Sequence, residues 1–517
     1  MDRRTWIAVV LCFLIFVGWQ KFYIEPRLPK TNTSQIAPSG TPVSAVSSVK
    51  DNKNTSFSRP TDKQQNQTLI TSDFKGNEAV ELSNGSKFFS NWRLAEYKKS
   101  QKDKSPVDLS SISFEEQTGL GELAFDIQEY AYLSTVYGTL TQTTGGARWD
   151  YEDKNVKIVR NYTLTEEKSV VLVDLQVLFK SLKPNYAFIS ISSKGSPDDN
   201  EKQDRQLLYY LNNTVERHML DDLKPAQEIY GSPNWIGAQS RYFLFSIVNE
   251  NKDAKGLLQS LGEHKGKISL VYPVSTNQFG LKLKTYFGPK EVNLLKKIDP
   301  TLESTVDFGW FTAVAYPILV VMKKIKEWVK NWGIAIILLT LLIKLLTFPL
   351  TYKSMASMKK MAALQPQLNA LKEKHANDKE ALNRELLTFM RTNGYNPMSG
   401  CLPMLIQMPV FFALYRVLYS SIELYQAPFF GWITDLSLKD PYYITPVLLT
   451  GFMYLQQKLT PSTISDPMQA KMMQWMPVFF GVLMINLPSG LTIYMLVNAI
   501  ASIFQQMYLN KKLNHVQ

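Results

Sequence analysis

The sequence predicts a polytopic α-helical membrane protein with six transmembrane helices and a large all-β domain outside the membrane. Three observations support this fold class. The apolar residues are clumped into segments long enough to cross a bilayer, basic residues concentrate towards the end of the chain, and short β-rich runs fill its middle. A length of 517 residues is also too great for one ordinary hydrophobic core.

Composition excludes several classes of site. The chain has 57 Lys and Arg against 45 Asp and Glu, and from residue 323 onward it has 19 basic and 9 acidic residues. Two cysteines, Cys12 and Cys401, are too few for a disulfide scaffold or a four-cysteine zinc site. The histidines are scattered without HExxH spacing, and there is no GxxxxGK[ST] loop. We therefore expect no metal, no cofactor, no catalytic residue and no nucleotide hydrolysis.

The first apolar segment is Trp6–Gln20, which follows Arg3 and Arg4. It is either a cleaved signal peptide or an uncleaved membrane anchor. A signal peptide requires a small-x-small cleavage site, and none follows the segment. Cys12 is preceded by a leucine rather than by the small residue that lipid attachment needs. The pattern favours an N-terminal transmembrane anchor in residues 1–24.

Five further apolar segments follow residue 330, and they are Gly333–Tyr352, Cys401–Ile422, Tyr443–Gln457, Met472–Leu487 and Leu491–Tyr508. About 20 residues at 1.5 Å each cross a hydrocarbon core of ~30 Å. The two short segments, 443–457 and 472–487, indicate either deep burial in a bundle or a thin bilayer where they cross.

Charge in the short loops predicts the orientation. Residues 353–391 carry eight Lys and Arg, whereas Lys439 is the one basic residue in the connection between the third and fourth spans. Cytoplasmic loops carry the excess of basic residues. We therefore expect both termini in the cytoplasm and residues from about 25 to 330 outside.

The outer region divides into three parts. Residues 25–68 are rich in Ser, Thr, Asn, Gln and Pro, which predicts a disordered linker. Residues 69–305 predict a β-sandwich domain, with a hairpin at Asn84-Gly85 between Ala79–Leu82 and Lys87–Phe89. Further β-rich runs are Val170–Phe179, Tyr186–Ser192, Arg241–Val248, Ile268–Val274 and Leu281–Phe287. Residues 306–332 predict an amphipathic helix in the outer interface.

Lys344 is the most informative residue. It lies near the middle of the second span, about 12–16 Å from either end, and its side chain reaches ~6 Å. A charge at this depth costs roughly 2.5–3.5 kcal/mol, and no other span carries an acidic residue in its middle. Either the span boundary is misplaced, or water reaches the ammonium through a cavity open to one side.

Other polar residues that fit such a cavity are Thr340, one helical turn before Lys344, Gln407 in the third span and Asn498 in the sixth. The alternative for each is an ordinary interhelical hydrogen bond.

The basic loop predicts a cytoplasmic helical hairpin over residues 353–395. Met355, Met358 and Met361 follow helical spacing beside Lys359 and Lys360, and Asp378 is a plausible N-cap for the second arm. The apolar faces of the arms either bury each other or offer an adaptable surface to varied clients. The basic outer face favours lipid headgroups or ribosomal RNA as its contacts.

Several motifs resemble the YidC-type membrane-protein insertases. Asn396-Pro397-Met398-Ser399-Gly400-Cys401-Leu402-Pro403 and Gln407-Met408-Pro409-Val410-Phe411 look like the family's third-span signature. Asp440-Pro441-Tyr442-Tyr443-Ile444, Asp466-Pro467-Met468-Gln469 and Leu487-Pro488-Ser489-Gly490-Leu491 match further on. The likeness is specific in residues 333–510 and rests on layout elsewhere.

The resemblance implies a periplasmic β-supersandwich and a five-helix insertase core over residues 333–510, in a bacterial inner membrane. It implies a hydrophilic groove open to cytoplasm and lipid, in which Lys344 takes the place of the usual Arg and Tyr494 takes part. The same resemblance implies that clients slide along the third and fifth spans, which makes Met408, Phe411 and Leu483 the expected slide residues. The implied partners are nascent inner-membrane proteins, the Sec translocon and the lipid bilayer, but not DNA. The resemblance also implies that the hairpin and the basic tail, residues 511–517, receive ribosomes or targeting factors.

Two other functions are compatible with parts of the sequence. In an enzyme, Lys344 acts as the general base for a Ser or Thr nucleophile, with Thr340 as the hydroxyl on its helix face. A small-solute transporter usually shows paired internal repeats and buried acidic residues, and neither is evident in the sequence.

Overall fold

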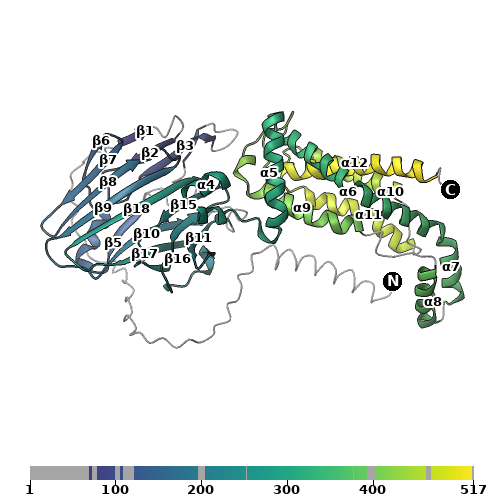
Figure 1. Cartoon of the computed structure of the whole chain (residues 1–517), viewed down its shortest axis with the longest axis horizontal. Coiled ribbons are helices and arrows are strands. Elements are labelled where there is room, and N and C mark those ends of the chain that lie inside the picture. Colours follow the sequence, from purple (N-terminus) through teal and green to yellow (C-terminus); the bar gives the residue numbers. More distant parts are fainter. Residues whose placement is uncertain are drawn as a thin grey trace. The chain divides into compact units, whose positions relative to one another are not determined.

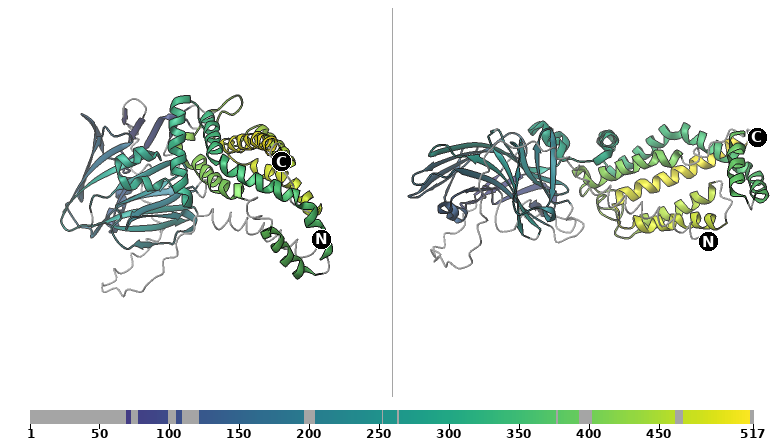
Figure 2. Two further views of the ribbon diagram at one scale, coloured as in Figure 1. Left: turned by 45° about the vertical axis from the view of Figure 1, so that its right-hand side comes forward. Right: turned by 90° about the horizontal axis from the view of Figure 1, so that it is seen from below.

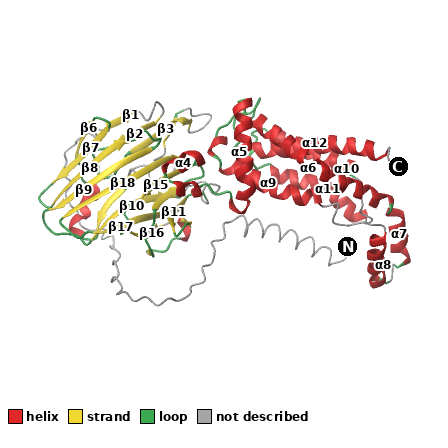
Figure 3. Ribbon diagram, viewed as in Figure 1, coloured by secondary structure: helices red, strands yellow, loops and turns green. Residues whose placement is uncertain are grey.

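The structure is a computed structural model that describes residues 69–72, 78–98, 105–108, 121–195, 204–251, 253–262, 264–375, 378–392, 402–460 and 467–514 (Figure 1). The predicted anchor (1–24) and linker (25–68) lie outside these residues, as do residues 393–401 and the end of the basic tail. Strands dominate the described chain up to residue 289, and helices dominate it afterwards (Figure 3).

The strands form three antiparallel sheets. The largest has the order β12 (Thr214–Met219), β11 (Gln206–Leu211), β14 (Trp235–Gln239), β15 (Phe243–Val248), β18 (Gln278–Pro289), β9 (Val170–Phe179), β8 (Val156–Leu164), β7 (Gly146–Glu152) and β6 (Thr139–Thr143). The second has the order β13 (Gln227–Ile229), β16 (Lys255–Gly262), β17 (Lys265–Pro273), β10 (Tyr186–Lys194) and β5 (Glu122–Phe125). The third has the order β1 (Leu69–Ser72), β2 (Glu78–Leu82), β3 (Asn91–Lys98) and β4 (Pro106–Asp108).

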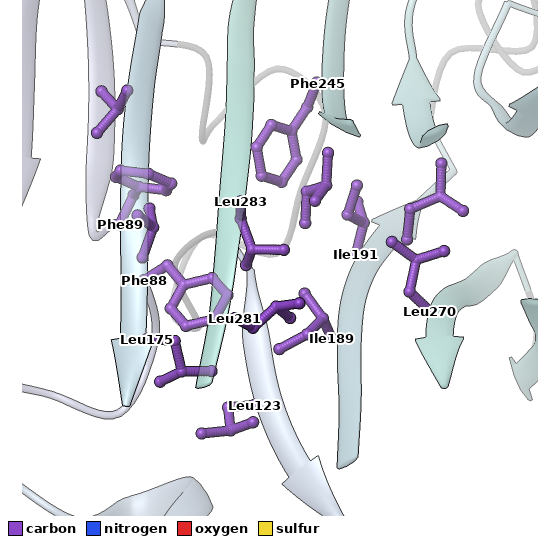
Figure 4. Close-up of a cluster of buried hydrophobic side chains, with 14 of the residues drawn as sticks. Phe88, Phe89, Leu123, Leu175, Ile189, Ile191, Phe245, Leu270, Leu281 and Leu283 are labelled. Atoms are coloured by element: carbon purple, nitrogen blue, oxygen red, sulfur yellow. The ribbon is translucent and has the colours of Figure 1, made fainter. Parts of the chain in front are cut away.

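Alternating side chains explain how the sheets pack. On β9, Val173, Leu175 and Val177 are buried, whereas Leu172 and Leu178 on the other face are exposed. This two-residue period places one face of the strand in a core. Figure 4 shows buried side chains from the nine-stranded sheet meeting those from the five-stranded sheet, and the labelled residues are Phe88, Phe89, Leu123, Leu175, Ile189, Ile191, Phe245, Leu270, Leu281 and Leu283. The mostly-sheet region is therefore organised around a shared hydrophobic core.

The hairpin predicted at Asn84-Gly85 is wrong in its second strand. β2 does pair with an antiparallel neighbour, but that neighbour is β3, with Val80 opposite Trp92. Lys87–Phe89 is not a strand, because its backbone is used elsewhere: the Phe88 N–H donates to the Gly121 carbonyl, and the Lys87 carbonyl accepts from the buried Arg160. The apolar pair Phe88-Phe89 is a core contact inside a loop rather than half of a tight hairpin.

The helices are α4 (Val292–Ile298), α5 (Thr312–Val329), α6 (Trp332–Ala363), α7 (Gln365–Lys374), α8 (Lys379–Thr392), α9 (Leu402–Ser420), α10 (Ile444–Leu459), α11 (Pro467–Met484) and α12 (Ser489–Asn514). Two of these described helices are long and apolar enough to cross a membrane, over Trp332–Lys360 of α6 and Ser489–Lys512 of α12. The other four of the six predicted spans stay predictions.

Helix α5 has the amphipathic character that the sequence predicts for residues 306–332. Ile318, Leu319 and Met322 are buried, and α5 packs against α6 and α9. Trp310 just before the helix and Trp328 near its end are both more than four-fifths exposed. Indole rings at both ends of an exposed face are typical of an interfacial helix. Pro317 is accommodated inside the helix.

The segment that carries the predicted hairpin forms two arms that lie side by side in Figures 1 and 2, with helix α7 beside α8. The helix that begins in the second span ends at Ala363, and Pro366 lies in the first turn of α7, where its missing N–H is tolerated. The Asp378 carboxylate accepts hydrogen bonds from the N–H groups of Glu380 and Ala381, which is the geometry of an N-cap.

We predict that truncating the inward face of β9 destabilises the sheet region and that truncating its outward face does not. Leu175→Ala removes a side chain with no exposed surface, so we expect a loss of about 2–5 kcal/mol. Leu172→Ala, on the same strand but 40% exposed, is the matched control, with an expected loss below about 1 kcal/mol. Denaturant unfolding of the full chain in detergent, followed by tryptophan fluorescence, measures both. Equal losses would contradict the assigned orientation of β9.

Candidate functional site

Helices α6 and α12 pack against each other and form the centre of the helical region. They run in the same direction. Near their starts, Gly490 lies close to the side chain of Ile336, and near their ends Lys359 donates to the Asn510 carbonyl at 3.0 Å. Polar side chains of the two helices therefore meet at similar heights.

The candidate site is centred on Lys344, which is half-buried on α6. Its ammonium donates to the Ser502 hydroxyl of α12 at 2.7 Å. Ser502 in turn donates its hydrogen to the Asn498 carbonyl at 2.7 Å. Within the described residues, no carboxylate lies within salt-bridge distance of Lys344. One neutral hydroxyl therefore holds the ammonium of Lys344. The other two N–H donors of the ammonium have no partner in the described part of the protein.

Three threonines of α6 follow the same side of the helix at helical spacing. Thr340 is buried, and its hydroxyl donates to the Ile336 carbonyl at 2.6 Å. Thr347 and Thr351 likewise donate to carbonyls three or four residues earlier. Their hydrogens are thus used inside α6, as is usual for threonine in a span.

A second polar contact joins α9 to α12. The side-chain amide of Gln407 donates to the hydroxyl of Tyr494, and Tyr494 is buried among the helices. Asn498 lies one turn further along α12 and is half-buried, and its side-chain amide has no hydrogen-bond partner among the described residues. Of the five residues predicted for the groove, the structure links Lys344 to Asn498 through Ser502, and Gln407 to Tyr494. Thr340 makes neither contact.

The predicted slide residues lie on α9 and α11. Extensive contacts join α6 to α12, α12 to α10 and α10 to α11, while α9 contacts α5, α6 and α12. Phe411 of α9 also packs against a small apolar cluster that includes Met484 of α11. Met408 on α9 and Leu483 on α11 are 42% and 43% exposed, and Phe411 packs against the core while remaining partly accessible.

The starts of α10 and α12 are tied together by a buried aspartate. The Asp440 carboxylate accepts hydrogen bonds from the Thr445 N–H and hydroxyl, the Tyr442 N–H and the Trp432 indole. The Thr445 hydroxyl contacts that of Thr492 on α12 at 3.1 Å. Burial alone raises the pKa of Asp440, but these hydrogen bonds outweigh it and hold the pKa below its usual value. Asp435, also buried, shows the opposite result, since burial raises its pKa despite hydrogen bonds from Ser437.

The hairpin residues predicted to meet clients or ribosomes are not equally accessible. Met355 is buried and Met358 is half-buried, and the side chain of Met361 lies outside the described residues. Lys359 donates a hydrogen bond to the last turn of α12, so one of its three N–H donors is used inside the protein. Lys360 is exposed.

Sequence reasoning missed Ser502 and Asp440 as structural partners. The signal for Ser502 was present, because Tyr494, Asn498 and Ser502 recur at intervals of four and define one face of a helix. Asp440 was read as part of a motif, without a role for its carboxylate. Its signal was the Asp-x-x-x-x-Thr spacing at the start of α10.

These features fit a membrane protein in which a mostly-sheet region precedes a helical region, with two described helices long and apolar enough to cross a bilayer. Comparison with known proteins gives the particular family. The family model described as "60Kd inner membrane protein" matches residues 324–516, and the model described as "YidC periplasmic domain" matches residues 79–321. The chain belongs to the YidC membrane protein insertase family.

Individual relatives agree with this assignment. The protein named "Membrane protein insertase YidC" from Syntrophus aciditrophicus (strain SB) is 34% identical over 99% of this chain and 100% of its own length. One of the same name from Citrifermentans bemidjiense is 50% identical over 56% of this chain and 55% of its own. A crystal structure titled as an active YidC insertase with its first transmembrane domain resolved shares 19% identity, covers 86% of this chain and 92% of its own, and has a TM-score of 0.37.

We predict that the Asp440 network weakens in acid. A carboxyl with a lowered pKa stabilises the fold at neutral pH, and this contribution is lost as the pH falls below the ordinary Asp value of about 3.9. The protection of the Thr445 amide, measured by hydrogen exchange from pH 7 to pH 3 and corrected for intrinsic exchange, should therefore fall in that range. In Asp440→Asn it should already be lower at neutral pH, by about 1–3 kcal/mol, and should depend less on pH.

Asp435→Asn is the control for this experiment, because the raised pKa of Asp435 means that the fold disfavours its ionised form relative to the unfolded chain. This substitution should leave the protection at pH 7 unchanged or higher. A loss at pH 7 as large as that of Asp440→Asn would contradict the assignment.

Proposed function

We propose that this protein is a membrane protein insertase and chaperone that inserts and helps to fold inner-membrane proteins through a hydrophilic groove open to cytoplasm and lipid. The single observation that supports the proposal best is Lys344, a cation with no ionic partner among the described residues, halfway along a membrane-crossing helix. Such a group is a functional-site candidate by default. The names of the relatives point to the same activity.

The groove lies between α9 and α11 and is lined by α6 and α12. Its polar residues are Lys344, Thr340, Gln407, Tyr494 and Asn498, joined by Ser502. Water and the ammonium reduce the cost of desolvating a short polar segment of the client. The client's apolar segment passes along Met408, Phe411 and Leu483 into lipid, and its burial drives the step at about 0.8 kcal/mol per CH₂.

The orientation follows from charge. The basic hairpin and both termini face the cytoplasm, and the sheet domain lies in the periplasm. The hydrogen-bonded connection around Asp440 fits an outer end that is closed, because its polar groups are satisfied by one another rather than by a water-filled opening. The proposed partners are nascent inner-membrane proteins, the Sec translocon, and ribosomes or targeting factors that reach Lys360 and the exposed hairpin surface.

The enzymatic alternative receives little support from the geometry. Thr340, the hydroxyl that it required, donates to its own helix and does not contact Lys344. Ser502 is close enough to serve as a nucleophile, but its hydrogen is directed to the Asn498 carbonyl, and Lys344 is the donor in their hydrogen bond. A general base would have to accept the hydroxyl hydrogen instead.

We predict that insertion requires a cation at residue 344. Replacing Lys344 by Arg should support growth of a strain depleted of its own insertase, whereas Ala and Glu should lower insertion by about tenfold or more, because a neutral or anionic group cannot offer the same donors. Protease protection of a small single-spanning client in liposomes containing the pure variants measures the rate. Insertion by Ala and Glu at the rate of Arg would remove the groove charge from the mechanism.

We predict that clients contact the slide residues during insertion. A photocrosslinking amino acid at Met408 or Leu483 should form adducts with a stalled nascent client. The same group at Val447 on α10 is the matched control, since it is 68% exposed but lies outside the proposed path. Adducts at Val447 as strong as those at Met408 and Leu483 would mean that exposure to lipid, rather than a defined slide, governs contact.

A further inference from the structure

We infer that Ser502 is a positioning residue for Lys344: its hydroxyl holds the ammonium at mid-depth so that the remaining donors face the client. This inference rests on the proposed function and goes beyond it by assigning a role to a residue of α12 that touches no client itself. The two residues are 158 positions apart in sequence, yet their polar atoms lie 2.7 Å apart.

The hydroxyl of Ser502 is oriented to accept a hydrogen bond from Lys344. Its own hydrogen is committed to the Asn498 carbonyl one turn earlier on α12, at 2.7 Å. A serine bonded to its own helix in this way has a fixed side-chain rotamer, and its free lone pairs point away from the backbone. Lys344 donates to those lone pairs. A hydroxyl that donates on one side and accepts from a cation on the other is polarised, which strengthens both bonds.

The pair also lies at matched depth. Lys344 is 12 residues after the start of α6, and Ser502 is 13 residues after the start of α12. Because the two helices run in the same direction, both residues lie about 18–20 Å from the outer ends of their helices. The contact therefore requires no tilt of the lysine towards either headgroup layer.

Lysine needs such a partner more than arginine does. Its ammonium is a compact point charge on a flexible four-carbon stem, and without a fixed acceptor it moves along the membrane normal towards headgroups. Ser502 opposes that movement. Since an ammonium has three donors and Ser502 takes one, two remain for water or for polar groups of the client.

The test compares Ser502→Thr with Ser502→Val in the full chain, reconstituted in liposomes. The two side chains have nearly the same shape and differ by the hydroxyl, and threonine can also bond to the carbonyl four residues earlier. We expect Thr to insert a small single-spanning client within about twofold of the parent protein, and Val to insert it about tenfold more slowly. Thr347→Val is the control, because it removes a hydroxyl that bonds within α6 alone, and it should change the rate by less than about twofold.

A second measurement separates positioning from packing. Modification of Lys344 by a membrane-permeant amine-reactive ester, quantified by mass spectrometry, should be several-fold faster in Ser502→Val than in Ser502→Thr, because the amine is released from its acceptor. A purely structural role would lower insertion without changing this labelling. If Val fails to fold, as judged by thermal unfolding in detergent, Ser502→Ala replaces it with the same expectations.

The outcomes are distinguishable. Equal insertion and equal labelling for Thr and Val would overturn the inference and leave the insertase proposal intact. Normal insertion by Lys344→Ala would remove the charge from the mechanism, whereas failure of the parent protein to insert the client in the same liposomes would overturn the proposed function itself. Covalent attachment of a serine-directed acylating probe to Ser502, lost in Lys344→Arg, would identify Ser502 as a nucleophile and would also overturn the positioning role.

Discussion

One ammonium lies on a helix that is long and apolar enough to cross a membrane, and such a charge requires polar partners. A cation near the middle of a span is unfavourable by roughly 2.5–3.5 kcal/mol. Within the described residues this charge is met by a hydroxyl on α12 instead of a carboxylate. A carboxylate would neutralise the site and occupy the donors. A hydroxyl holds the ammonium in place and leaves two of its three N–H donors available.

The surroundings of Lys344 differ from one end of the helices to the other. At the outer end, the Asp440 carboxylate accepts four hydrogen bonds and links the start of α10 to α12. Buried polar groups that are fully satisfied make a region rigid and specific. At mid-depth, the amide of Asn498 and two donors of Lys344 have no partners among the described residues. Satisfied polar groups at one end and unsatisfied groups beside them fit the proposed groove, which is closed at the first end and open at the other.

Sequence predicts a part of the fold well in two cases. Either the apolar residues repeat with the clear period of a strand or helix, or a residue has a large free-energy cost in its predicted environment. β9 was predicted with its observed bounds because alternating apolar residues define a strand with one buried face. Lys344 stands out in the sequence because a charge in the middle of an apolar segment is rare. Lys87–Phe89 was mistaken for a strand because burial of two phenylalanines in a loop gives the same local pattern as burial in a sheet.

Ser502 escaped prediction for a physical reason that extends beyond this site. Serine is tolerated in a membrane helix because it can bond to its own backbone, so its presence signals nothing by itself. Its role comes from a neighbour 158 residues away, and only packing of α6 against α12 at a matched height creates the contact. The same self-bonding that hides the residue from sequence analysis also suits it to its task, because a hydroxyl whose hydrogen is already committed can only accept. A cation on the facing helix is the group that such an acceptor holds best.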